Sequence, residues 1–136
     1  MKEPAWIEES DVHAIHECVL ALHGGATGIR DAALLKSALR RPRHHMAHAD
    51  DSQVIDMAAP YTAGIVRNHP FVDGNRRTGF VICVLFLELN GYRFNAGEED
   101  AIKAVLALAA GDLSEAVFTK WPHAKVQQLR RGTRPR

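Results

Sequence analysis

The sequence predicts an all-α protein, a compact bundle of about six or seven helices around a buried central helix at about Asn75–Asn90. Two observations support this class. No segment alternates apolar and polar residues with a period of two for more than a few positions. The run from Gly79 to Leu87 is apolar throughout, and a helix without a polar face lies in the middle of a fold. With about half of the ~20 apolar residues that a membrane span needs, this run is too short to cross a bilayer.

The remaining helices follow from apolar stripes with the helical period and from residues that favour helix ends. We expect Ser10 and Asp31 to cap the first two helices, Pro42 to end the second, and Pro60 to kink or split the third. Tyr92–Phe94 is expected to be a short extended link. The expected ranges are Ser10–His23, Ala32–Arg41, Gln53–Arg67, Glu98–Ala110 and Ser114–Pro122.

Composition indicates one ordinary globular domain. The chain has 136 residues, of which 46% are hydrophobic and 24% charged. We assign residues 1–124 to a single domain and residues 125–136 to a basic, flexible tail. The formal net charge of +1 gives no general attraction to nucleic acid or to anionic membranes, so neither is an expected partner.

The chain shows no sign of export. Its first residues contain no apolar signal-peptide core. Cys18 and Cys83 each lie inside an apolar helical pattern, which predicts buried free thiols. Both observations favour a cytoplasmic protein.

A dense group of polar residues precedes the central helix. Unpaired N–H groups and a partial positive charge at a helix N-terminus bind anions, phosphates above all. Two arginines strengthen this preference, and a nearby carboxylate can hold a metal ion that accompanies the phosphate. The pattern predicts a phosphate-handling active site. The group comprises His69, Asp73, Asn75, Arg76 and Arg77.

Each residue type suggests a role. His69 is the candidate general base, because imidazole titrates near neutral pH. Asp73 is a candidate Mg²⁺ ligand or a helix cap, and it can serve as both. Gly74 lets the backbone approach a phosphate closely. Asn75 either donates to a phosphate oxygen or caps the helix.

Arginines provide the candidate phosphate-binding cations. Arg76 and Arg77 point about 100° apart on a helix and can grip two different phosphates. Without an anion between them, two arginines at a helix N-terminus are electrostatically misplaced. Arg67, two residues before His69, either joins the site or is a solvated helix end.

The segment His69–Arg77, HPFVDGNRR, resembles the signature loop of the Fic/Doc (Fido) family, and most closely that of its death-on-curing (Doc) toxin branch. The runs HGGATGIRDAALLKSAL, DMAAPYTAGIVRNHPF and LELNGYRF resemble the same branch in the same order. The resemblance implies a Fido-type bundle and a site formed by His69, Asp73 and Arg77. It also implies that the loop Gly24–Asp31 lies beside the site and receives a protein substrate.

The family contains two chemistries, and two positions distinguish them. Members that transfer AMP have a glycine where this chain has Arg76 and a second arginine where it has Phe80. The Doc branch has a basic residue, usually lysine, at the first position and no arginine at the second. The resemblance therefore implies a kinase that uses ATP and Mg²⁺ to phosphorylate translation elongation factor Tu.

A toxin of this branch is controlled by a second chain. No match to the inhibitory helix motif [ST]xxxE[GN] of self-restrained relatives is present, so the resemblance implies an antitoxin whose segment folds into a groove beside the loop. Two alternatives remain open, an AMP-transferring enzyme and a binding module that has lost catalysis.

Overall fold

The structure, a computed structural model, describes residues 3–48 and 52–129. Within these ranges the chain forms six α-helices, two 3₁₀ helices and one pair of strands, which confirms the expected all-α class. The elements in chain order are α1 (Glu9–His23), α2 (Ala32–His48), η1 (Val54–Met57), α3 (Ala58–Asn68), α4 (Asn75–Leu89), β1 (Tyr92–Phe94), α5 (Glu98–Ala110), α6 (Glu115–Lys120), η2 (Trp121–Ala124) and β2 (Val126–Gln128).

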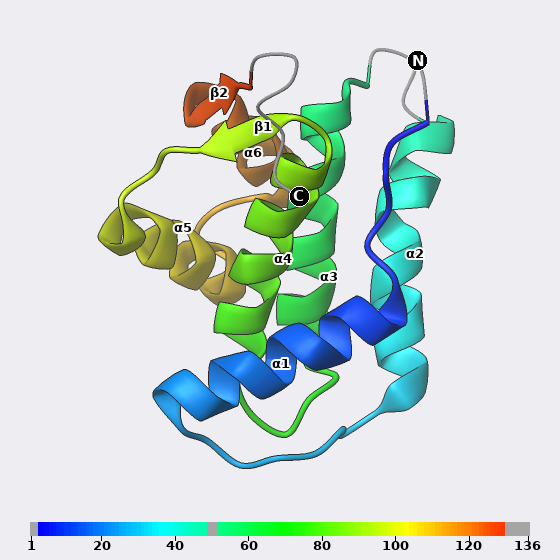
Figure 1. Cartoon of the computed structure of the whole chain (residues 1–136), viewed down its shortest axis with the longest axis vertical. Helices are drawn as coiled ribbons and strands as arrows, with labels where there is room; N and C mark the ends of the chain where they lie inside the picture. Colours follow the sequence, from blue (N-terminus) through cyan, green and yellow to red (C-terminus); the bar gives the residue numbers. More distant parts are fainter. Residues whose placement is uncertain (1–2, 49–51, 130–136) are drawn as a thin grey trace.

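The helices α3 and α4 form the middle of the molecule. Figure 1 shows them side by side, with α2 along one flank of the pair and α5 along the other. α1 crosses the end of this layer at which α4 begins, and the two strands lie at the opposite end. The connection from α3 to α4 therefore lies under α1.

The most deeply buried helix is α3, a feature that the sequence pattern did not reveal. Every residue from Ala58 to Val66 is buried, whereas α4 leaves Val81 37% exposed. The two helices approach closely at Gly79, whose carbonyl oxygen accepts a hydrogen bond from the Thr62 hydroxyl (2.8 Å). The buried centre is thus a helix pair, with α4 as its second member.

Two helix ends differ from expectation. α1 begins at Glu9, because Glu8 and Asp11 form a reciprocal capping box, and Ser10 lies within the first turn. α2 continues through Pro42 to His48. Pro42 removes one backbone hydrogen bond, at a cost of about 3 kcal/mol, but its ring is buried on the helix face that packs toward α3. Tertiary packing therefore overrides the local signal.

Other local predictions are confirmed. Asp31 caps α2 by accepting a hydrogen bond from the Leu34 N–H (3.0 Å), and Ser114 caps α6 in the same way. Pro60 lies in the first turn of α3, where its missing N–H is harmless, and a 3₁₀ turn precedes the helix. The expected third helix is thus split, as Pro60 predicted.

The fold continues beyond the expected domain end at residue 124. β2 pairs antiparallel with β1, so that Phe94 lies opposite Val126. The Leu129 N–H then donates to the carbonyl oxygen of Gly91 (2.7 Å). Val126 also packs against the main core. The remainder of the expected tail, residues 130–136, lies outside the described residues.

The two cysteines occupy different environments. Cys83 is buried in α4, as expected, and burial raises the pKa of its thiol to about 12. Cys18 is exposed on α1, so the expectation of a second buried thiol was wrong. No helix in the described part of the chain has the length and apolar character to cross a membrane.

Candidate active site

His69 lies at the point where α3 ends and the signature loop begins. Its N–H donates to the carbonyl oxygen of Ile65 (3.0 Å), which makes it the C-terminal cap of α3. Its backbone is left-handed, with φ of 51°, and it is the one non-glycine residue with positive φ in the described ranges. Such a conformation costs a residue with a side chain about 1–2 kcal/mol. The imidazole is exposed and lines a large cavity.

Asn75 holds the loop in shape. Its side-chain amide accepts a hydrogen bond from the Phe71 N–H (3.0 Å) and donates to the Phe71 carbonyl oxygen (2.9 Å). The Asn75 side chain is only 4% exposed. Of the two roles left open, the geometry favours the structural one, because the buried amide serves the protein backbone. Phosphate binding by this side chain stays a prediction, which the two contacts to Phe71 do not favour.

Asp73 is held from two directions. One carboxylate oxygen accepts from the Gly74 N–H (2.9 Å) and the other from the Ala26 N–H (3.2 Å). The ring Nε2–H of His16, on α1, donates to the Asp73 carbonyl oxygen (2.8 Å). His16 also stacks on the Phe71 ring, with centroids 3.8 Å apart. α1 and the signature loop are thereby joined at the candidate metal ligand.

Two glycines are required around this carboxylate. Gly74, at the N-terminal end of α4, has φ of 79°. Gly25 has φ of 125°, and a Cβ atom there would lie 2.9 Å from the Asp73 carboxylate. The sequence analysis treated the Gly24–Gly25 pair as a helix terminator, but Gly25 also makes room for Asp73.

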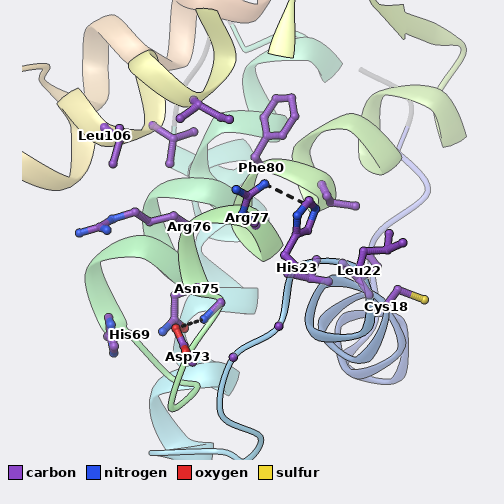
Figure 2. Close-up of a pocket in the computed structure, with 18 of the residues that line it drawn as sticks. Cys18, Leu22, His23, His69, Asp73, Asn75, Arg76, Arg77, Phe80 and Leu106 are labelled. Atoms are coloured by element: carbon purple, nitrogen blue, oxygen red, sulfur yellow. Dashed lines mark hydrogen bonds between the residues drawn. The ribbon is translucent and has the colours of Figure 1, made fainter. Parts of the chain in front are cut away.

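Arg76 and Arg77 extend into the same cavity from the first turn of α4. In Figure 2, Arg76 extends to the side on which His69 lies, whereas Arg77 points toward His23. The Arg77 guanidinium contacts the His23 ring at 3.5 Å. No side chain caps α4, so the N–H groups of its first turn are available to an anion.

Arg67 does not join this group. It does not line the cavity, and its guanidinium forms an ion pair with Glu115 of α6 (3.2 Å). Arg41 of α2 pairs with the same carboxylate. A carboxylate distant in sequence therefore holds this arginine outside the cavity, and its contribution to nucleotide binding stays a prediction.

The cavity has a volume of about 970 Å³. Its polar end is formed by the signature loop and the start of α4. Its opposite end is apolar and includes the exposed side chains of Leu22, Val81 and Leu106. The site thus offers a place for charged groups beside an apolar groove between α1, α4 and α5.

The loop between α1 and α2 runs directly along the signature loop. Ile29 and Phe71 form an antiparallel bridge. The Val72 N–H donates to the Gly28 carbonyl oxygen (3.0 Å), and the Arg30 N–H to the Pro70 carbonyl oxygen (2.7 Å). The expected position of residues 24–31 beside the site is confirmed. His16, His23 and Arg30 were not predicted as site residues, because only the fold brings them to the loop.

The donor set is suited to a metal–phosphate complex. Asp73 is exposed to the cavity, and each of its oxygens keeps a lone pair beyond the backbone contact described above. Mg²⁺ commonly takes one or two carboxylates and completes its coordination with phosphate oxygens and water. Among the described residues, no cluster of three or more histidine, cysteine or acidic side chains could form an all-protein cage. The residues fit an ion that arrives with a phosphate ligand.

Comparisons with known proteins agree on one family. A profile described as the Fic/DOC family matches residues 6–87. The chain is 28% identical over 108 residues to the "Protein kinase doc" of Escherichia phage P1, an alignment that covers 79% of this chain and 85% of the phage protein. It is 36% identical over 74 residues to the "Toxin Doc" of Mycolicibacterium smegmatis, covering 54% of this chain and 57% of that protein.

Proposed function

Because this chain belongs to the Fic/Doc family, and to its Doc branch, we propose that it is a toxin that transfers the γ-phosphate of ATP to a serine or threonine hydroxyl of a protein. One observation carries the proposal. A single cavity receives a free imidazole (His69), a carboxylate (Asp73) and two arginines (Arg76 and Arg77) at a helix N-terminus. These are the groups that phosphoryl transfer requires.

In this reaction His69 accepts the proton of the substrate hydroxyl. The hydroxyl oxygen forms a bond to the γ-phosphorus, and the bond from that phosphorus to the β–γ bridging oxygen breaks, which releases ADP. Asp73 would hold Mg²⁺, and the ion would supply positive charge that neutralises the phosphates of ATP. Arg76, Arg77 and the first N–H groups of α4, including that of Asn75, bind the phosphate oxygens. Gly74 allows their close approach.

Two residues favour γ-phosphate transfer over AMP transfer. Arg76 occupies the position of the glycine that opens the loop in AMP-transferring relatives. Phe80 replaces their second arginine, and its half-buried ring packs edge-on against Phe94 (5.7 Å between centroids). An aromatic ring at this place cannot bind a phosphate. We infer that ATP enters with its γ-phosphate toward His69.

The proposed substrate and place of action rest on the resemblance to the Doc branch. We propose elongation factor Tu as the phosphorylated protein, in the bacterial cytoplasm, where arrest of translation stops growth. The phage relative carries the words "protein kinase" in its name and the second relative the word "toxin", which supports kinase activity and toxicity. A binding module without catalysis is less well supported, since His69, Asp73 and Arg77 are all retained.

The apolar end of the cavity suggests where control is exerted. Leu22 is 80% exposed and Leu106 44%, and both border the groove next to the arginines. Apolar side chains around a groove favour an amphipathic segment that folds on binding. We propose that an antitoxin segment occupies this groove and blocks access to the phosphate-binding end.

A growth assay tests the toxin proposal. Expression of the chain in bacterial cells should arrest growth. Expression of His69→Ala at the same level, measured by immunoblot, should not, because the base is lost while the fold remains. Normal growth with soluble wild-type protein would contradict the toxin proposal.

The same assay tests the antitoxin groove. Co-expression of the cognate antitoxin, which we expect a neighbouring gene to encode, should restore growth. Leu22→Glu, which places a charge in the groove, should stay toxic in its presence. Val117→Glu is the matched control, because Val117 is 58% exposed on α6 and does not line the cavity. Equal rescue of both variants would argue against this groove.

A further inference from the structure

Arg30 lies in the loop between α1 and α2, and its side chain contacts the end of α3. Its Nε–H donates to the carbonyl oxygen of His69 (2.6 Å), and its Nη2 donates to that of Asn68 (2.7 Å). We propose that Arg30 is a positioning residue that holds the backbone of His69 in the conformation from which its imidazole acts. The proposal rests on the function inferred above for its kinetic consequence, but its structural part can be tested separately.

The end of α3 requires such a partner. The last carbonyl groups of a helix lack intrahelical donors and carry partial negative charge. A guanidinium satisfies two adjacent carbonyls at once and has the charge that suits this helix end. A lysine at the same place would carry the same positive charge but would lack the planar arrangement of donors.

The backbone of His69 makes this contact consequential. A left-handed residue with a Cβ atom persists only where its surroundings hold it. The Arg30 side chain contacts the carbonyl oxygen of the peptide group before His69, that of Asn68, and of the peptide group after it, that of His69. The main-chain N–H of Arg30 donates to the next carbonyl oxygen, that of Pro70. The Asp31 N–H also donates to Pro70 (3.0 Å). The short segment that contains Arg30 and Asp31 therefore holds the peptide groups on both sides of the candidate base, His69.

Arg30 acts through the backbone and is not expected to contact ATP. It does not line the cavity, and the described partners of its guanidinium are the carbonyls of Asn68 and His69. Loss of the guanidinium should leave the phosphate-binding groups of α4 in place. The expected defect is in turnover, because a small displacement of a catalytic group slows a reaction more than it weakens ground-state binding.

The test compares Arg30→Ala and Arg30→Lys with the control Arg40→Ala, which removes an exposed arginine on α2. For Arg30→Ala we expect kcat for phosphate transfer to fall about 10-fold or more, with unchanged Mg²⁺–ATP affinity and unchanged KM for the protein substrate. Arg30→Lys should recover part of kcat. Arg40→Ala should match the wild type.

Amide hydrogen exchange provides the readout that does not depend on activity. The N–H groups of His69, Phe71 and Val72 are hydrogen-bonded within the protein. They should exchange faster in Arg30→Ala than in the wild type, while amides in the middle of α3 should not change. If the wild type transferred no phosphate but this difference appeared, the proposed function would fail and the positioning role would stand.

Three results would overturn the inference. Unchanged exchange at His69, Phe71 and Val72 would show that Arg30 does not hold the loop. Unchanged kcat for Arg30→Ala in an active enzyme would show that the contact of Arg30 with the loop does not affect catalysis. A rise in KM for the protein substrate at constant kcat would instead make Arg30 a substrate contact.

Discussion

Asp73 illustrates how the site is built at the scale of single residues. Backbone N–H groups from two loops hold its carboxylate, and His16 holds its carbonyl oxygen. Arg77 lies deeper in the cavity, beside His23. The carboxylate is therefore placed before any ligand arrives, and the arginines supply positive charge around it. Metal and phosphate binding should depend on different side chains.

Two substitutions separate these functions. Asp73→Ala should remove most of the Mg²⁺ dependence of ATP binding. Arg77→Ala should keep that dependence but weaken ATP affinity roughly 10- to 100-fold, the scale of one lost hydrogen bond to a charged group, roughly 1.5–3 kcal/mol. Titration calorimetry with and without Mg²⁺ measures both effects. Arg93→Ala, an exposed arginine on β1, is the control. Unchanged affinity in both site variants would place the phosphate site elsewhere.

Sequence reasoning identified most of the candidate site but not the partners of each residue. His69, Asp73, Arg76 and Arg77 do line one cavity, as their spacing before a buried helix predicted. The position of the Arg67 guanidinium depends on Glu115, forty-eight positions later in the chain, so no local sequence pattern could reveal it. The buried amide of Asn75 required knowledge of the path of the loop. The positions of Arg67 and Asn75 in the structure both depend on contacts that the sequence pattern does not show.

At the scale of elements, a buried carboxylate joins η1 to the C-terminal segments. Asp56 is buried, and its carboxylate accepts hydrogen bonds from Lys120 (3.0 Å) and His123 (2.6 Å). Burial alone would raise the pKa of Asp56, but hydrogen bonds from the Gln53 N–H, His123 and Lys120, together with charge on His123, lower it below its ordinary value. The ionised form therefore stabilises the fold.

The stability of Asp56→Asn should reveal this contribution. Because the folded pKa of Asp56 is depressed, its stabilisation is present above its ordinary pKa of 3.8 and is lost as the pH falls through the folded value. The variant should unfold with a free energy roughly 1–3 kcal/mol smaller at pH 7, and the difference should narrow below pH 3.8. Urea denaturation across this range measures it, with the exposed Asp112→Asn as control. A difference that did not vary with pH would contradict the assignment.

The elements themselves were predicted well where local signals and packing agree. α5 spans Glu98–Ala110, as its apolar stripe and the following glycine indicated. α2 was predicted too short, because Pro42 was weighed as a helix breaker. Pro42 is buried on the same face of α2 as Leu35 and Ala38, and this packing keeps it inside the helix. β2 has only three residues and is held by pairing with β1, so its sequence alone carried little signal.

At the scale of the whole molecule, α1, α4 and α5 enclose a cavity with a charged end and an apolar end. We propose that the chain is a single domain that includes the described residues through Leu129. In the proposed function, the charged end would take the phosphates and residues 24–31 would receive the substrate protein. The apolar end would take the antitoxin. Catalysis and control would then share one groove.

The position of the transferred label tests the central claim most directly. The purified chain is incubated with Mg²⁺, elongation factor Tu and ATP labelled at either the α- or the γ-phosphate, with His69→Ala as the inactive control. Since Arg76 stands where AMP-transferring relatives have a glycine and Phe80 where they have a second arginine, we expect the γ-phosphorus to face His69. We predict that elongation factor Tu gains label from γ-labelled ATP alone and that His69→Ala transfers none. Label from the α-phosphate would mean AMP transfer and would contradict the account.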